Sequence, residues 1–305
     1  MKYEYPLTIL TPTYNRKNTI TKLYDSLKKQ TIKNFQWLVI DDGSVDDTRN
    51  YFETLKKDEK FTIEYYYKNN AGKHTALNYA HPYIKGELVC IVDSDDWLLP
   101  TAVETILKYW GTYSNNSNIC GLTFLKGYDE NKSVANFNNI SKEPVISNHI
   151  DYRVNAGRKG DCCEIIRSKI FQEFKFPEFE NEKFLGESYL WNSIGFNYDT
   201  VYINEILYIC EYLEGGLTKS GRKLRISCPY GGMANSKTYF IRKNNRKVKL
   251  KILIKEAWLF ICYGKFAKLS RKEIISKSET KYLIRLNWLF GGLLHYYWKR
   301  KFGEA

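Results

Sequence analysis

Short apolar runs alternate with amphipathic segments over the first 125 residues of this chain. The apolar runs are "YPLTILTP", "FQWLVI", "FTIEYYY", "ELVCIV" and "NICGLTFL". Each run has the length of a buried strand, and the segments between them carry apolar residues at helical spacing. This alternation predicts a mostly parallel sheet with helices on both faces, and therefore an α/β fold.

The length and composition are those of a globular protein. The 305 residues suffice for one large domain, or for one domain with a smaller unit, and the hydrophobic fraction of 43% argues against disorder. The seven cysteines are odd in number and form no C-x-x-C pair, which disfavours a disulfide framework or a structural zinc site. The N-terminus "MKYEYPLTIL" has no apolar segment typical of a signal peptide. We therefore expect a reducing, cytosolic environment.

Polar residues follow four of the predicted strands at their carboxyl ends. They occupy positions 11–15, 41–44, 69–73 and 93–96. In open parallel sheets, ligands bind beyond the carboxyl ends of the strands, so four polar loops at one edge predict a binding site there. No G-x-G-x-x-G follows the first strand and no G-x-x-x-x-G-K-[ST] is present, which disfavours a dinucleotide fold and excludes a P-loop.

The fourth of these loops is unusually acidic, with Asp93, Asp95 and Asp96 in "VDSDDW". A turn or a helix N-cap would explain one aspartate. Three like charges repel one another unless a cation neutralises them, and D-x-D on an extended segment projects two carboxylates to one side. Mg²⁺ or Mn²⁺ bound by one or two carboxylates completes its shell with phosphate oxygens and water. The acids therefore favour a metal–diphosphate site over a capped turn.

Five segments of the sequence together resemble the family 2 glycosyltransferases, which have the GT-A fold. The segments are "LTILTPTYNR", "WLVIDDGSVDDT", "NNAGKHTALNYA", "GELVCIVDSDDWLLP" and "EKFLGESYLWN". The first four lie in order within residues 7–100, and the fifth extends the resemblance to residue 192. Residues 220–305 carry no matching motif. The resemblance implies a Rossmann-like nucleotide-binding sheet with helices on both faces.

The resemblance also implies a reaction and a set of site residues. It implies an inverting transferase that uses a nucleotide-diphosphate sugar, most often a UDP-sugar, together with Mn²⁺ or Mg²⁺. The residues implied around the nucleoside are Thr11, Pro12, Tyr14 and Asp41. Those implied along the ribose, the diphosphate and the donor sugar are Asn70, Lys73, Asp93 and Ser94. The implied metal ligand is Asp95.

The catalytic base of this family is usually an acid in a Glu-Asp pair. The corresponding dipeptide here is Glu187-Ser188, which leaves Glu187 as the implied base and Glu182 as the nearby alternative. Without the resemblance, Glu187 would be interpreted as a surface residue of a helix. The processive membrane synthases of the family carry Q-x-x-R-W and several transmembrane helices, and neither is present here. We therefore expect transfer of one sugar per acceptor.

The net charge of +13 is concentrated toward the end of the chain. Runs such as "RKNNRKVKLKILIK" and "YYWKRK" predict a helical extension that is basic and aromatic. The segment "KYLIRLNWLFGGLLHYYWKRK" is too polar to span a bilayer, but its aromatic residues and flanking cations suit a helix on a membrane surface. Each Lys or Arg near an anionic leaflet would add about 1 kcal/mol to such binding. The alternative is that these helices pack on the catalytic core.

These inferences predict a division of the chain and a function. We expect a catalytic domain over residues 1–225, with a nucleotide-sugar-binding half (1–125) and an acceptor half (126–225), followed by the extension (226–305). The expected reaction moves one hexose to a hydroxyl of a saccharide acceptor, expected to be lipid-linked, in bacterial surface polysaccharide synthesis. The expected location is cytoplasmic, at the inner face of the plasma membrane, with peripheral membrane contact through the extension.

Two other classes of protein remain open at this point. A metal-dependent nucleotidyltransferase would also use acids, a metal and a nucleotide, but would bind a nucleoside triphosphate and release pyrophosphate. A basic nucleic-acid-binding protein without catalysis would explain the net charge and the aromatic fraction of 16%. No recognised nucleic-acid module appears, and the acids at the sheet edge would repel phosphate without a metal. We therefore expect no nucleic-acid partner.

Overall fold

The computed structural model describes residues 3–55, 61–135, 141–211 and 217–303, with residues 217–220 described by their backbone alone. The chain divides into two compact units, each made of several segments. The first comprises residues 1–148, 157–175 and 198–211, and the second residues 149–156, 176–197 and 212–305. The predicted division at residue 225 stays a prediction.

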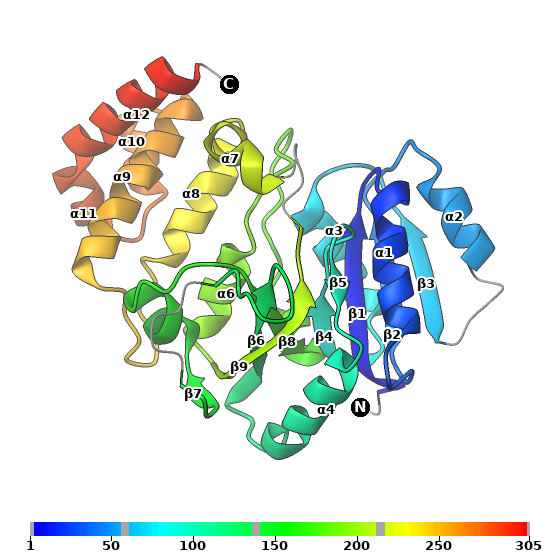
Figure 1. Ribbon diagram of the computed structural model, residues 1–305. Helices are drawn as coiled ribbons and strands as arrows, with labels where there is room; N and C mark the ends of the chain where they lie inside the picture. Colours follow the sequence, from blue (N-terminus) through cyan, green and yellow to red (C-terminus); the bar gives the residue numbers. More distant parts are fainter. Residues whose placement is uncertain (1–2, 56–60, 136–140, 212–216, 304–305) are drawn as a thin grey trace. The chain divides into compact units, whose positions relative to one another are not determined.

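Within the described residues, the first unit contains a mixed sheet of nine strands (Figure 1). They are β1 (Tyr5–Thr13), β2 (Gln36–Asp41), β3 (Thr62–Tyr67), β4 (Gly86–Ile91), β5 (Trp97–Leu98), β6 (Ile119–Gly127), β7 (Val145–Ser147), β8 (Cys162–Arg167) and β9 (Asp199–Ile209). The order across the sheet is β3-β2-β1-β4-β8-β6-β9-β5, and β7 pairs with β9. β1 to β4 are mutually parallel, whereas β8 lies antiparallel between β4 and β6.

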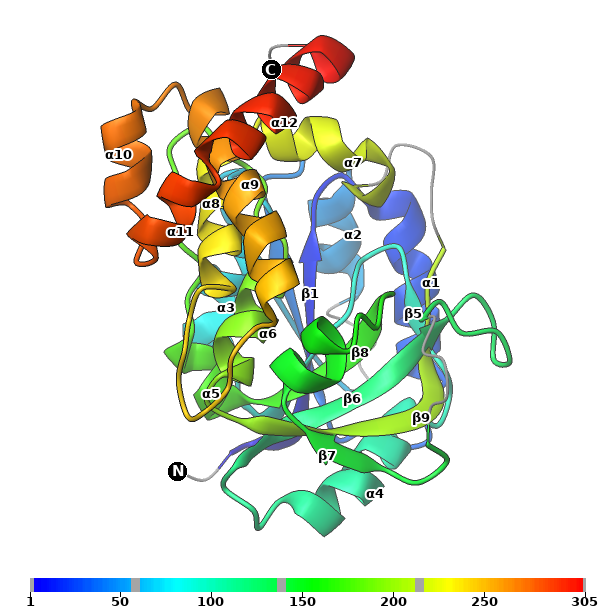
Figure 2. The same ribbon diagram turned by 90° about the vertical axis from the view of Figure 1, so that its left-hand side faces the viewer.

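Helices cover both faces of this sheet. They are α1 (Lys17–Lys28), α2 (Thr48–Leu55), α3 (Lys73–Ala80), α4 (Ala102–Tyr113) and α5 (Ser168–Glu173), with a 3-10 turn at His81–Tyr83. α1 and α2 lie on one side of β1, and α3 lies on the other (Figure 2). The predicted α/β fold with helices on both faces is therefore confirmed. The sheet is mixed rather than mostly parallel, because β5, β7 and β8 pair antiparallel with their neighbours.

An aromatic core joins α1 and α2 to the sheet. The Trp37 side chain of β2 is fully buried, and its ring stacks on Tyr24 of α1 at a centroid distance of 5.9 Å. Phe52 of α2 meets the same indole edge-on at 5.3 Å. Burying one such ring stabilises the fold by about 1.5–3 kcal/mol. This core packs α1 and α2 against β2, whose carboxyl end carries one of the polar loops.

The described part of the second unit is built of helices. A π-helical segment (Ile150–Asn155) is followed by α6 (Ser188–Gly195), α7 (Leu217–Ile226), α8 (Pro229–Thr238), α9 (Leu250–Phe266), α10 (Arg271–Ser276), α11 (Lys281–Leu286) and α12 (Trp288–Phe302). α9 is the central helix and packs against both α8 and α12. Its fully buried Phe260 and Ile261 lie at the heart of an apolar core. A helical C-terminal part is therefore present, as predicted. No helix among the described residues is long and apolar enough to cross a membrane.

Candidate functional site

The strand register of the first unit aligns the carboxyl ends of β1, β2 and β3. Thr13 lies opposite Asp41, and Asp41 lies opposite Tyr67. The ladder continues past the strand ends, since the Asp42 amide donates to the Thr13 carbonyl (2.8 Å) and the Lys68 amide donates to the Asp41 carbonyl (2.9 Å). β4 pairs with the other side of β1, so the acidic loop follows at the same edge. The predicted convergence of four polar loops is observed.

Most residues predicted around the nucleoside are buried and have partners within the protein. The Thr11 hydroxyl accepts from the indole of Trp37 (3.0 Å). The fully buried Asp41 carboxylate accepts from the Tyr65 hydroxyl (2.5 Å) and from the Ser44 amide (2.7 Å). Pro12 is also buried. Tyr14, by contrast, has 46% of its surface exposed. Of the four, only Tyr14 presents a large face to solvent, and their roles toward a nucleoside stay predictions.

Asp42 organises the loop after β3, and the sequence analysis did not single it out. Its carboxylate, 3% exposed, accepts from the Lys68 ammonium (2.6 Å) and from the amides of Ala71 (3.0 Å) and Gly72 (2.7 Å). The Asn70 amide group donates to the Asp42 carbonyl (2.8 Å). One buried carboxylate therefore fixes the backbone between Asn70 and the start of α3. Its only sequence signal was the second aspartate of "IDDGS".

Gly43 allows this loop to approach the turn after β2. Its φ of +87° is one that side chains rarely adopt, and a Cβ there would lie 2.6 Å from the Asn70 amide nitrogen. Because that contact is with backbone, no rotamer change would relieve it. The glycine is therefore required where the two loops meet. Asn70 and Lys73 are consequently positioned by the turn after β2.

The three acids of the fourth loop have three different partners. Asp93 forms an ion pair with Lys73, the first residue of α3. Asp95 lies 3.7 Å from the Arg16 guanidinium, and its side chain is 22% exposed. Asp96 is 5% exposed and accepts from the Tyr208 hydroxyl (2.6 Å). Ser94 is buried between them at 5% exposure. The predicted residues Lys73, Asp93 and Asp95 are thus brought together.

Electrostatics separates the three carboxyls. Burial alone would raise the pKa of Asp93, but the charges of Lys73 and Lys126 outweigh it and hold that pKa below its usual value. Burial and the Asp93 charge raise the pKa of Asp95. The same two causes raise the pKa of Asp96 to about 7. Burial and the Asp93 charge therefore disfavour the charged forms of Asp95 and Asp96.

Tyr208 and Lys126 support this loop from β9 and β6. The Tyr208 hydroxyl accepts from the Asp93 amide (2.9 Å) while it donates to Asp96. The Lys126 ammonium lies 3.9 Å from the centroid of the Tyr208 ring. Neither residue has a sequence signal, because both reach the acids only through the pairing of distant strands. Tyr208 lies 112 positions from Asp96 along the chain.

The acidic loop has the donor atoms that a hard divalent cation prefers. Within the described residues, no three carboxylate, imidazole or thiol groups are placed to bind one ion. A cation here would therefore take oxygen ligands from one or two carboxylates, the arrangement in which Mg²⁺ keeps water and phosphate ligands. Asp95 is the best placed, because its side chain is 22% exposed and its Arg16 partner lies at 3.7 Å, beyond hydrogen-bond distance. The residues present fit the predicted metal.

The second unit contains both candidates for the catalytic base. The oxygens of Glu182 accept from the amides of Tyr230 (2.8 Å) and Gly231 (2.7 Å), in the first turn of α8. A carboxylate there satisfies amides that have no partner within the helix. Glu187 is half-buried and immediately precedes α6. Glu182 thus has a structural role that accounts for its position, and Glu187 as base stays a prediction.

Comparison with known proteins identifies the family. The model of the family described as "Glycosyl transferase family 2" matches residues 8–173, which is more than half of the chain. The chain belongs to this glycosyltransferase family. The match spans all four polar loops and ends within α5. The predicted family is confirmed, and it disfavours both a nucleotidyltransferase and a nucleic-acid-binding protein.

Curated relatives of this glycosyltransferase vary in length. A UDP-Glc:alpha-D-GlcNAc-diphosphoundecaprenol beta-1,3-glucosyltransferase, WfgD of Escherichia coli, is 31% identical over 201 residues, which are 63% of this chain and 70% of that protein. An uncharacterized glycosyltransferase of Rickettsia felis is 35% identical over 107 residues, 35% of this chain. The match covers only 17% of the Rickettsia protein. The chain thus corresponds to a small part of some relatives.

Solved structures support the fold of this family 2 glycosyltransferase. S. aureus TarS 1-349, crystallised in complex with UDP-GlcNAc, matches with a TM-score of 0.60. The match covers 97% of this chain and 91% of the TarS chain at 17% sequence identity. An identity this low establishes a shared fold. The predicted GT-A fold with a helical C-terminal part is therefore confirmed.

Proposed function

We propose that this protein is an inverting glycosyltransferase that moves one sugar from a UDP-sugar to a hydroxyl of a lipid-linked saccharide. The main support is that Lys73, Asp93 and Asp95 lie together at one edge of the sheet. The chain that carries them belongs to glycosyltransferase family 2. The name of the WfgD relative includes a UDP-sugar donor and a diphosphoundecaprenol-linked acceptor. The similar TarS 1-349 structure is a complex with UDP-GlcNAc.

The donor would bind across the four polar loops. Tyr14 offers an exposed ring on which a base can stack. Asn70 and Lys73 follow along the ribose and the diphosphate, with the Lys73 ammonium offsetting charge that grows on the leaving group. The ion pair with Asp93 keeps that ammonium at the sheet edge. Asp93 and Ser94 lie where the ribose or the donor sugar would contact the loop.

A divalent cation, Mn²⁺ or Mg²⁺, would be held by Asp95. When bound, it supplies Lewis-acid stabilisation of the diphosphate leaving group. The cation would also stabilise the charged form of Asp95. Burial and the neighbouring Asp93 charge disfavour that form and raise the pKa of Asp95. A bound cation favours the charged carboxylate, so this site gains more from a cation than a solvated aspartate would.

The bond changes follow from inversion. The acceptor oxygen attacks the anomeric carbon from the face opposite the diphosphate, the bond from that carbon to the diphosphate breaks, and UDP leaves. Glu187 takes the proton of the acceptor hydroxyl. Glu182 is the weaker candidate because both its oxygens are engaged by the first turn of α8.

The biological setting is part of the same proposal. An acceptor carried on a polyprenyl diphosphate is confined to a membrane, so its transferase must work at that surface. We place the protein at the cytoplasmic face of the plasma membrane, in the synthesis of a bacterial surface polysaccharide. The donor sugar fits the hexose class because the WfgD relative is a glucosyltransferase.

The test is a calorimetric titration of UDP into the purified protein with Mn²⁺, and again with EDTA. Wild-type protein should bind UDP with Mn²⁺ and lose most of that affinity in EDTA. Asp95→Asn should bind weakly in both conditions, whereas the control Asp47→Asn, an exposed acid near α2, should behave as wild type. Absence of binding to UDP, dTDP and GDP alike would overturn the proposal.

A further inference from the structure

One face of α11 and α12 is apolar and turned to solvent. Six side chains on it are 53–73% exposed, and we call them the apolar stripe: Tyr282, Leu286, Leu289, Leu293, Tyr296 and Tyr297. The spacing is four residues within α11 and three or four residues from 289 to 296 within α12, so each helix carries its part of the stripe on one side. An exposed apolar face of this length is unusual for a surface that meets only water.

The opposite face of the same helices already makes the packing contacts. Ile284, Gly291 and Trp298, each seven residues apart, are buried. A Cβ on Gly291 would lie 2.5 Å from the Ile261 Cβ, so α12 packs on α9 with almost no space between them. Trp298 meets Tyr263 edge-on at 5.8 Å. The helices are therefore anchored without the apolar stripe, which must serve another purpose.

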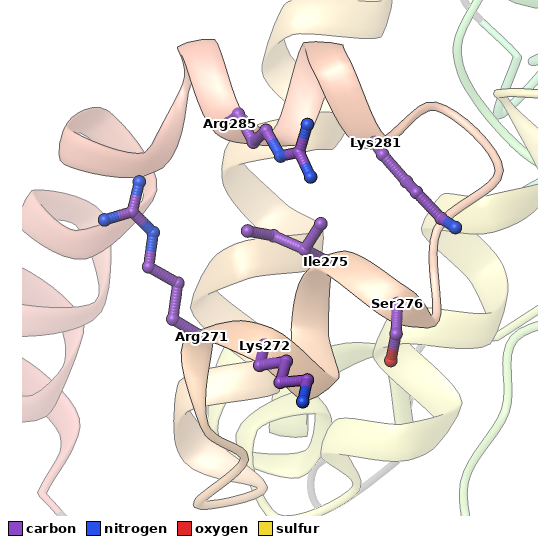
Figure 3. A pocket seen from close by; sticks show the side chains of 6 residues that line it. All are labelled: Arg271, Lys272, Ile275, Ser276, Lys281 and Arg285. Carbon is purple, nitrogen blue, oxygen red and sulfur yellow. The ribbon is translucent and has the colours of Figure 1, made fainter.

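A group of cations lies beside the apolar stripe. Arg271 and Lys272 of α10 and Lys281 and Arg285 of α11 line a hollow of about 470 Å³, together with Ile275 and Ser276 (Figure 3). We call it the basic hollow. Arg285 reaches from α11 toward the side of α10 that carries Ile275 (Figure 3).

The four cations of the basic hollow are not offset by acids. The ion pairs among the described residues include none of them. Residues 250–302 hold twelve Lys or Arg against three Glu. Unoffset cations of this kind attract anionic groups, and a phosphate can bind both guanidinium and ammonium donors. The basic hollow therefore has the chemistry of a phosphate site.

We propose that the apolar stripe and the basic hollow form one membrane-docking surface that binds an anionic leaflet. The stripe enters the boundary between headgroups and acyl chains, and the hollow binds lipid headgroup phosphate. α11 couples the two, because Lys281 and Arg285 alternate along it with Tyr282 and Leu286. Tyrosines beside cations are the composition that membrane interfaces favour. The inference rests on the proposed function insofar as that function places the acceptor in a membrane.

A lipid surface fits this face better than a second copy of the chain does. A symmetric dimer through the apolar stripe would bring two sets of cations together, and like charges placed together across an interface weaken association. A leaflet that carries negative charge offers the complement of both features at once. The charge of the surrounding helices therefore selects the anionic membrane.

The test measures binding of the full chain to vesicles by co-sedimentation. Wild type should bind vesicles containing phosphatidylglycerol and bind vesicles of phosphatidylcholine alone much more weakly. Replacing the four cations of the basic hollow by Gln should weaken binding to the anionic vesicles more than about tenfold. Leu289→Gln with Leu293→Gln should do the same while keeping helix propensity. The matched control variant replaces four exposed lysines of the first unit by Gln, at positions 29, 108, 142 and 169. This variant should bind the anionic vesicles nearly as well as wild type.

Two outcomes would overturn the inference. One is equal binding by wild type and both sets of variants. The other is a wild-type dimer in light scattering that the Leu289→Gln/Leu293→Gln variant abolishes, with no vesicle binding by either protein. Because the vesicle assay uses neither donor nor acceptor, its result is independent of the UDP titration that tests the proposed function. If wild-type protein binds UDP but not anionic vesicles, only the membrane-docking surface is wrong. If it binds the vesicles but not UDP, dTDP or GDP, only the proposed transferase function is wrong.

Discussion

At the scale of single residues, Asp42 holds the loop that positions Lys73. We expect Asp42→Ala to lower the free energy of unfolding by about 2–4 kcal/mol, because the buried Gly72 amide and the part-buried Ala71 amide lose their acceptor and the Lys68 ammonium loses its carboxylate partner. Donor binding should weaken as well. Urea unfolding and UDP calorimetry would measure the two effects.

The control for this experiment is an exposed charge on α2. Glu53 pairs with Arg49 at the surface of α2, where both side chains are more than half exposed. Such pairs contribute little, so Glu53→Gln should leave both the unfolding curve and UDP binding unchanged. If Asp42→Ala is no more destabilising than Glu53→Gln, the Asp42 network is not what holds the loop.

His81 gives the protein a stability that depends on pH. It is 7% exposed, and burial and the Lys175 charge lower its pKa to about 4. Between pH 6.5 and 4 the unfolded chain binds a proton at this residue and the folded chain does not, so stability falls as pH is lowered through this window. The loss should be on the order of 2 kcal/mol.

His81→Gln removes the titrating group and should flatten that pH dependence. Urea unfolding of wild type and variant, repeated from about pH 7 down toward pH 4, would measure it. Wild-type stability should fall more steeply than that of the variant. Parallel curves would mean that His81 is free to take up its proton in the folded state.

The difference between Asp41 and Asp42 shows where prediction of single residues ends. Both stand at the end of the apolar run "WLVI", and the local sequence pattern does not distinguish their contacts. Asp41 turns toward Tyr65 and Ser44, whereas Asp42 turns toward Lys68 and the start of α3. The partners of each acid depend on how the loop after β3 folds back toward β2, and the sequence next to the two acids does not specify this. The acidic character of this edge was predictable from the sequence, but the different contacts of Asp41 and Asp42 were not.

At the scale of elements, local pattern predicted β1 to β4, β6 and the helices between the first four strands. β8 was not predicted, because "CCEIIR" lies antiparallel in the middle of the sheet and follows a long excursion of the chain. β5 has only two residues and is defined by its pairing with β9. Strand pairings set by distant segments leave no periodic signal. For the same reason, Tyr208 of β9 could not be linked to the acidic loop.

Two acids at the start of helices offer a test of the catalytic base. We expect Glu187→Gln to lower the transfer rate by about 10²–10⁴-fold, because a general base contributes that much, with an unchanged unfolding curve. Glu182→Ala should instead lower the free energy of unfolding by about 1–2 kcal/mol, because the first turn of α8 loses its cap. Sugar transfer at saturating donor and chemical denaturation would separate the two effects.

The pattern of losses decides the assignment. If Glu182→Gln, which keeps one acceptor for the α8 amides, abolishes transfer while Glu187→Gln retains it, the base is Glu182. If both variants retain transfer, neither acid is the base. The proposed roles are supported if Glu187→Gln lowers only the transfer rate and Glu182→Ala lowers only the free energy of unfolding.

At the scale of the whole molecule, the two compact units do not follow the order of the chain. The second unit collects residues 149–156 and 176–197 as well as everything after 212. α6, which Glu187 precedes, is tied to α8 by the Ser188 hydroxyl bond to Asn235 (2.9 Å) and the Asn192 bond to Thr238 (2.9 Å). The region of the predicted base therefore depends on helices beyond residue 225.

A fragment ending at residue 225 tests the predicted domain boundary. It would lack α8 and α9, and with them most of the core that surrounds Phe196 and Phe260. The fragment would also leave Glu182 without the amides that it caps. We expect limited proteolysis to cleave the fragment rapidly within residues 176–197, while the sheet of the first unit, whose strands all precede residue 211, stays protected. Full-length protein under the same protease should resist cleavage there. Equal protection in both would make residue 225 a folding boundary and would mean that α6 holds its place without α8.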